Sequence, residues 1–299
     1  MIPYKDRDQI FVLSGIDDLY TFLDENLANI NMIRGNQYKA VVEGPAEALR
    51  KSLIMMNTVT EDMLTLQKSW MYLENIFSSQ EIKRVLGPEN SMFEKINVFF
   101  TQQMQLASKM QYAQKYLQKN MKPLLTTQLK QYNEQVDYIM KQLANFLETK
   151  RNEFARFSFL SDDELLEILA KQSDPHAIQG FLKQLFDGLF KLKLSDTNDS
   201  IAMISREGEE IEFKRAVKHQ NKVEDWLNKV QDDMRQTLTR RLKEGNTSYP
   251  SERQAKKEWI LKEPAQVVLT VDMIQWCVGT ETAISDMLDE PDALNQWYT

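Results

Sequence analysis

Residues 45–77 constrain the fold more than any other stretch, because their apolar side chains recur at helical spacing along the whole segment. Pro45 suits the first turn of a helix, where its missing amide costs nothing. The apolar positions are Leu49, Leu53, Met56, Met63, Leu66, Trp70, Leu73 and Phe77. They predict one helix of roughly 34 residues, which would span ~50 Å. Such a rod suits an elongated body better than a compact enzyme.

The same spacing predicts helices through most of the remaining chain. The expected ranges are 16–34, 93–117, 129–146, 162–172, 176–192 and 222–244, with Gly245 as the stop of the last one and a further helix that begins at Pro264. The chain has only 9 Gly and 8 Pro, which leaves little material for β-turns. We therefore predict a mainly α fold, an elongated multi-helix bundle array with a small β-hairpin insertion.

Range 129–146 carries an almost regular heptad of apolar residues. Antiparallel packing within a bundle is favoured over an intermolecular coiled coil, because the pattern lasts only about three heptads. In the last helix, we expect Val267, Val268, Val271, Ile274 and Ile284 to face inward, with Trp276 nearby.

A short apolar segment joins two helical halves of the chain. Ser161 and Glu164 form a capping box that predicts a helix start at residue 162. Just before it, Phe157, Phe159 and Leu160 are too apolar for a solvated loop and too few for a helix. We interpret the segment as a buried extended connector, with both phenylalanines in the core in preference to an exposed recognition role.

Two strand signals interrupt the helices. Residues 10–13 read as a strand whose hairpin partner would lie upstream of Met1. Residues 201–204 and 211–213 predict a hairpin with its turn around Glu207 and Gly208. An isolated hairpin is marginal in water, so this one must dock on the bundle or on a partner.

Charge and composition narrow the classes of function. A net charge of −7 argues against non-specific nucleic-acid binding, although a local basic patch is compatible with it. The one cysteine, Cys277, excludes a disulfide framework and favours a reducing compartment. No uninterrupted run of about 18 apolar residues occurs, so no membrane segment is expected.

The residues that usually carry chemistry are sparse. Neither GxxxxGK nor GxGxxG occurs, and His176 and His219 stand apart without CxxC or HExxH to complete a metal site. We predict no catalytic, metal-binding or nucleotide-binding residue in this stretch, and no cofactor. For the cation pairs Lys150 with Arg151 and Arg240 with Arg241, solvated helix ends are favoured over pairing with a partner's carboxylates.

Several segments together resemble the linker region of dynein heavy chains. They are MLTLQKSWMYLENIFSSQEI, KRNEFARFSFLSDDELLEIL, MISREGEEIEF, KVEDWLNKVQDDMRQTL and EWILKEPAQVVLTVDMIQWC, in the same order as in that family. The resemblance covers residues 4–284, and QVVLTVDMIQWC is more similar to axonemal than to cytoplasmic members.

The resemblance implies a mechanical part. In that family the linker is a helical arm that joins the tail to a ring of AAA+ modules and bends and straightens as ATP turns over. The resemblance assigns residues 1–122 to an N-terminal helical subdomain of the linker and residues 123–299 to a C-terminal helical subdomain with the hairpin at 200–213. A deformable join is expected between residues 122 and 200. Its candidate hinge residues are Arg156, Phe157, Phe159 and Leu160. The candidate contact residues of the hairpin are Glu207, Gly208, Ile211 and Phe213.

The implied cofactors, ATP and Mg, would bind in the downstream ring. The implied partners are the AAA+ ring of the same heavy chain, the tail with dynein intermediate or light chains indirectly, and microtubules through the whole motor, with no nucleic acid and no membrane. The location implied is the cytoplasm and cytoskeleton, with the axoneme of a cilium or flagellum favoured. A passive helical tether or adaptor shares the long amphipathic rods, and an enzyme would need a convergent polar pocket.

Overall fold

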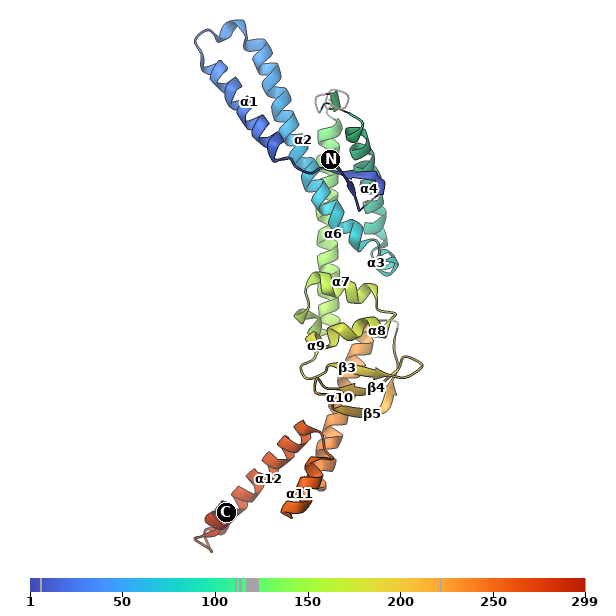
Figure 1. The fold of residues 1–299 in the computed structure, drawn as a ribbon, viewed down its shortest axis with the longest axis vertical. Helices are drawn as coiled ribbons and strands as arrows, with labels where there is room; N and C mark the ends of the chain where they lie inside the picture. The colour runs from blue at the N-terminus through green and yellow to red at the C-terminus, as the bar shows by residue number, and fades with distance from the viewer. Residues whose placement is uncertain (6, 111, 113–114, 117–123, 221, 299) are drawn as a thin grey trace. The chain divides into compact units, whose positions relative to one another are not determined.

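A computed structural model describes residues 1–5, 7–110, 112, 115–116, 124–220 and 222–298 (Figure 1). The chain forms two compact units, Met1–Glu148 and Thr149–Thr299. The subdomain boundary that we predicted between residues 122 and 123 lies outside the described residues and stays a prediction. The expected mainly α fold with a small β insertion is confirmed.

The first unit is built on long helices. Its elements are β1 (Ile2–Tyr4), β2 (Arg7–Val12), α1 (Asp17–Gly35), η1 (Lys39–Val41), α2 (Glu43–Ile76), α3 (Gln80–Val85), α4 (Gly87–Ser108) and most of α6 (Leu124–Glu153). The 34 residues of α2 confirm the predicted rod. Helix α4 ends at Ser108, and Ala113 and Leu117, which we expected to extend it, lie outside the described residues.

Strand β2 has its partner within the chain. It pairs antiparallel with β1, in a register that sets Ile2 opposite Val12, so the expectation of a partner upstream of Met1 is wrong. The reversal passes through Lys5, whose φ of 51° lies in the left-handed region. Glycine or asparagine usually occupies such a position, which is why the sequence carried no turn signal here.

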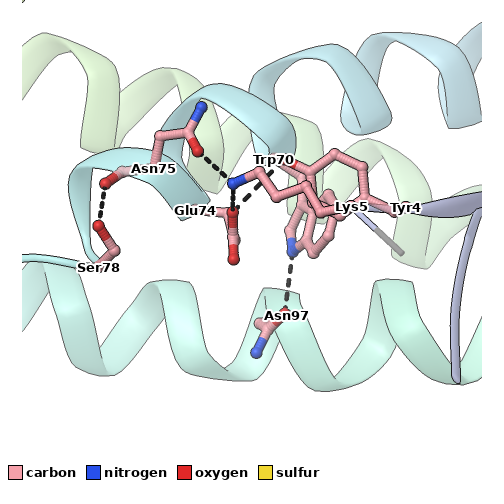
Figure 2. A network of polar contacts seen from close by, with 7 residues as sticks. All are labelled: Tyr4, Lys5, Trp70, Glu74, Asn75, Ser78 and Asn97. Atoms are coloured by element: carbon pink, nitrogen blue, oxygen red, sulfur yellow. Dashed lines mark hydrogen bonds and ion pairs between the residues drawn. The ribbon is translucent and has the colours of Figure 1, made fainter. Parts of the chain in front are cut away.

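Trp70 organises the core of the first unit. Its side chain is fully buried, stacks on Phe100 at 4.5 Å between ring centroids and meets the Tyr4 ring at 5.2 Å. Its indole N–H donates to Asn97 Oδ1 at 3.0 Å. Figure 2 shows how Lys5 reaches α2 beside this cluster, where its ammonium pairs with Glu74 at 2.6 Å. These contacts hold the N-terminal hairpin on α2 and α4.

The second unit combines short helices, one sheet and two longer helices. After the end of α6 its elements are η2 (Ala155–Phe159), α7 (Asp162–Ala170), α8 (Pro175–Ile178), η3 (Gln179–Phe181), α9 (Leu182–Leu185), β3 (Lys191–Leu194), β4 (Ser200–Ile204), β5 (Glu210–Val217), α10 (Val223–Thr247), α11 (Arg253–Ile260), α12 (Ala265–Asp286) and α13 (Ala293–Tyr298). The capping box of Ser161 and Glu164 is present, and it starts α7 where we predicted.

The predicted hairpin is part of a three-stranded antiparallel sheet of order β3-β4-β5. The expectation of one helix over 176–192 is wrong, because the segment forms α8, η3 and α9, which end at Leu185, and its last two residues belong to β3. Helix α9 ends at Leu185, the turn that follows contains Gly188, whose φ of 81° suits glycine, and β3 then pairs with β4. The third strand helps to stabilise a hairpin that would be marginal alone.

Gly245 lies inside α10 and does not end it, contrary to our expectation. A Cβ at this position would lie 3.0 Å from Val267 Cγ1, so glycine allows α12 to approach α10 closely. Val267 and Val271 are buried at this contact, as predicted.

The rest of α12 differs from the predicted inward face. Ile274 and Ile284 are 37% and 54% exposed, and Trp276 is 55% exposed, whereas the buried contact of α12 with Gly245 and Trp259 is made by Val267 and Val271. By length and composition alone, α12 is a helix that could cross a membrane, and only 17% of its apolar window is buried. No uninterrupted apolar run of that length was apparent in the sequence.

Candidate functional site

The connector before α7 is a 3₁₀-helix. The amide of Phe157 donates to the carbonyl of Phe154 at 3.0 Å, and the amide of Leu160 donates to the carbonyl of Phe157 at 3.0 Å. A 3₁₀-helix repeats every three residues, so Phe154, Phe157 and Leu160 share one face. All three are buried. The predicted extended conformation is therefore wrong.

Phe159 lies off that face and is 68% exposed. The expectation that it joins Phe157 in the core is wrong for the same geometric reason: an extended chain puts residues two apart on one side, whereas a 3₁₀-helix separates them. Phe159 is thus the one candidate hinge aromatic that the second unit leaves open to solvent.

Arg156 ties the connector to two other elements. Its Nε donates to Gln231 Oε1 of α10 at 2.7 Å, and its Nη1 donates to the carbonyl oxygen of Leu185 at 2.9 Å. The guanidinium also lies 4.9 Å from the centroid of the Phe186 ring. A planar guanidinium can make both kinds of contact at once. Arg156 therefore holds the connector to α9 and α10.

Ion pairs reinforce the same region. Lys150 Nζ pairs with Glu224 of α10, whose side chain is only 2% exposed, and with Glu153 at 2.7 Å. Arg151 pairs with Asp162 at 2.6 Å, across the connector. The interpretation of Lys150 and Arg151 as a solvated helix end is wrong, because both charges are engaged by carboxylates of the same unit.

The pKa values follow from these contacts. Burial lowers the pKa of Lys150, but its hydrogen bonds with Glu153 and Glu224 outweigh that effect, so the pKa is raised. The hydrogen bond from Lys150 lowers the pKa of Glu153. Both groups are therefore held in their charged forms around neutral pH.

The hairpin between β4 and β5 divides into a buried part and an open turn. Phe213 is 8% exposed, and β5 packs against α10, so the hairpin docks within its own unit. Ile211 is partly buried. Glu207 and Gly208 are exposed at the turn, where Gly208 has a φ of 89°. Of the four candidate contact residues, only these two are fully open to solvent.

Glu209, which sequence reasoning missed, links the turn to α12. Its Oε1 accepts a hydrogen bond of 2.8 Å from the amide of Ala265, the first residue of α12. A carboxylate is favoured at a helix N-terminus by the free amides and by the helix dipole. The two residues are far apart in sequence, so no local pattern announces the contact.

The two histidines lie in different surroundings. His219 packs edge-on against Trp226 at 5.1 Å between ring centroids, and burial lowers its pKa. His176 is exposed, with its Nε2 3.1 Å from Asn198 Oδ1. Among the described residues, no group of three His, Cys, Asp or Glu side chains could hold a metal ion.

The long helices, the packed connector and the small docked sheet define a class: a mainly helical structural region with a small β insertion. A family model described as dynein heavy chain, N-terminal region 2, matches residues 1–245 and so spans both units. The chain belongs to the dynein heavy chain family.

Axonemal proteins are among its relatives. The chain is 33% identical to human dynein axonemal heavy chain 6, over 93% of this chain and 7% of that protein. It is 32% identical to mouse dynein axonemal heavy chain 2, over 98% of this chain and 7% of that protein. It is 31% identical to the dynein-1-beta heavy chain of the flagellar inner arm I1 complex of Chlamydomonas reinhardtii, over 96% of this chain and 6% of that protein. The chain thus spans less than a tenth of the length of these relatives.

Proposed function

We propose that this chain is the mechanical linker of an axonemal dynein motor. In this proposal it bends and straightens across an AAA+ ring and transmits ATP-driven change to the tail. The observation that carries the proposal is the family match over residues 1–245, which includes α2, α4, α6, the connector, the β4–β5 hairpin and most of α10.

The deformable join is proposed within residues 122–200. Inside that range, Lys150 pairs with Glu224 of α10, and Arg156 donates to Gln231 of α10 and to Leu185 of α9, which favours a connector that moves together with α10. We therefore favour a bend in the part of α6 that precedes Lys150. The exposed turn at Glu207 and Gly208 is the proposed contact of the hairpin with the ring, since Phe213 is taken up by internal packing.

ATP and Mg would bind in the ring downstream of this chain, and the force would reach microtubules through the whole motor. The tail, with intermediate or light chains attached to it, would receive the movement. The proposed location is the cytoskeleton of a cilium or flagellum.

Energy transfer between two dyes on the whole heavy chain tests the proposal. One dye is placed at Lys51 on α2 and the other at Asp232 on α10, both exposed. The separation should change between the nucleotide-bound and nucleotide-free motor. A dye pair at Asp163 and Asp232, both within the second unit, should report no change.

A passive helical tether is the second candidate, because the same amphipathic helices would serve it. In a tether, both dye pairs keep a constant separation through the ATPase cycle. That result would refute the mechanical proposal.

A further inference from the structure

Four cations were singled out in the sequence, and three of them find carboxylates within the second unit. Lys150 pairs with Glu224, and Arg151 pairs with Asp162. Arg241 pairs with Glu263 at 3.3 Å and approaches Glu244 at 3.7 Å. Arg240 is different: its Nε is buried and has no hydrogen-bond partner among the described residues. The Arg240 side chain as a whole is only partly buried, so a ligand would reach it through the exposed part of the guanidinium and not through Nε.

Arg240 lines a hollow of about 520 Å³ along α10. Three further cations line the same hollow, Lys214 of β5 with Arg235 and Lys243 of α10. Within the described part of the chain, none of the four cations lies within ion-pair distance of a carboxylate. The hollow also contains Asp233 and Glu244, and Glu244 is already near Arg241. In a chain with a net charge of −7, this hollow is a local excess of positive charge.

We propose that the hollow binds an acidic peptide segment of a partner protein. Arg235 and Lys243 stand eight positions apart on one helix, which separates their backbones by ~12 Å. An extended peptide covers that distance with about four residues. A single small anion would reach only part of the row of cations, whereas two or three carboxylates along a peptide would reach all of it.

The hollow also offers neutral groups for the backbone of such a peptide. Gln236 and Thr239 line it beside the cations. Arg240 additionally lines a neighbouring hollow of about 460 Å³ that contains Glu210, Glu212 and Glu263. A role of Arg240 toward those internal carboxylates is the competing explanation, and the experiment separates the two.

The test measures the fluorescence anisotropy of a fluorescein-labelled peptide of alternating Glu and Gly, titrated with the chain at low salt. Arg240→Gln should weaken binding about tenfold, because a charge-assisted fork is lost. Lys243→Gln and Arg235→Gln, both exposed and therefore harmless to folding, should each weaken binding about threefold. The affinity should also fall as salt is added.

Lys229→Gln is the matched control, since Lys229 is an exposed cation of α10 outside the hollow. This variant should bind the peptide with the same affinity as the unaltered chain. A lower melting temperature of Arg240→Gln with unchanged peptide affinity in all three hollow variants would assign Arg240 to the internal carboxylates and overturn the proposal. Equal binding of single-stranded RNA, or complete competition by inorganic phosphate at low concentration, would overturn the peptide as the ligand.

Discussion

Lys150, near the end of α6, forms an ion pair with Glu224 in the first turn of α10, and the Glu224 side chain is almost completely buried. The pair joins α6 to α10, two helices that the connector, the small helices and the sheet separate in the sequence. Removing one partner leaves a buried charge without compensation, which costs far more than the loss of an exposed pair.

Lys150→Ala should therefore lower the free energy of unfolding by about 3 kcal/mol, measured by urea denaturation. Lys171→Ala is the matched control, because Lys171 and Glu167 form a pair in which both side chains are 49% exposed. The control should cost less than ~0.5 kcal/mol. Equal effects of the two substitutions would show that the Lys150 pair does not stabilise the unit.

The 3₁₀ connector supplies two phenylalanines in opposite environments. Phe157→Ala removes a fully buried ring and should cost about 3 to 5 kcal/mol in free energy of unfolding. Phe159→Ala removes a ring that is 68% exposed and should change that free energy by less than about 0.5 kcal/mol. If the two variants were destabilised alike, the assignment of the connector as a 3₁₀-helix would be wrong.

Glu209 should protect the start of α12. Glu209→Ala removes the acceptor of the Ala265 amide and should cost about 1 kcal/mol of local stability. Hydrogen exchange at the first-turn amides of α12 should accelerate accordingly. Glu207→Ala, which alters an exposed carboxylate of the same turn, should leave that exchange rate unchanged.

His219 should make the stability of the second unit depend on pH. Burial lowers its pKa from the ordinary value of 6.5, so the unfolded chain takes up a proton before the folded chain does. The free energy of unfolding should fall as the pH drops below about 6.5 and should level off once the folded-state pKa has been passed.

His219→Gln should remove this pH-dependent component, and His176→Gln, at an exposed histidine, should retain it. Thermal denaturation followed from about pH 8 to pH 5 measures both. The contribution of Glu153 appears in a different window, because its pKa is lowered from 4.5 and its stabilising effect is lost only under more acidic conditions. An identical pH profile for the two histidine variants would contradict the assignment to His219.

Local patterns predicted the elements whose causes are local. The apolar spacing of α2 and the capping box of Ser161 and Glu164 were readable because helix periodicity and capping involve residues within one or two turns. The same reasoning predicted the wrong conformation for the connector, because three apolar residues fit an extended strand and a 3₁₀-helix equally well. Only the packing of Phe154 beside Phe157 and Phe186 decides between them.

Elements that depend on distant partners could not be predicted. Strand β1 depends on a left-handed turn at Lys5, and β3 depends on its antiparallel pairing with β4. The contacts of Glu209 with Ala265 and of Lys150 with Glu224 join residues whose neighbours in sequence give no sign of either partner. Gly245 was read as a helix stop because glycine commonly ends helices, although here it admits Val267.

Trp70 gives the first unit an optical reporter of its own. It is the sole tryptophan between residues 1 and 148, since the other tryptophans are Trp226, Trp259, Trp276 and Trp297. Trp70 is enclosed by Phe100 and Tyr4, so its fluorescence should have a short emission wavelength while the β1–β2 hairpin is packed against α2. The emission should shift to longer wavelength when the hairpin detaches. In a chain whose other four tryptophans are replaced by phenylalanine, fluorescence would therefore report the unfolding of the first unit separately from that of the second.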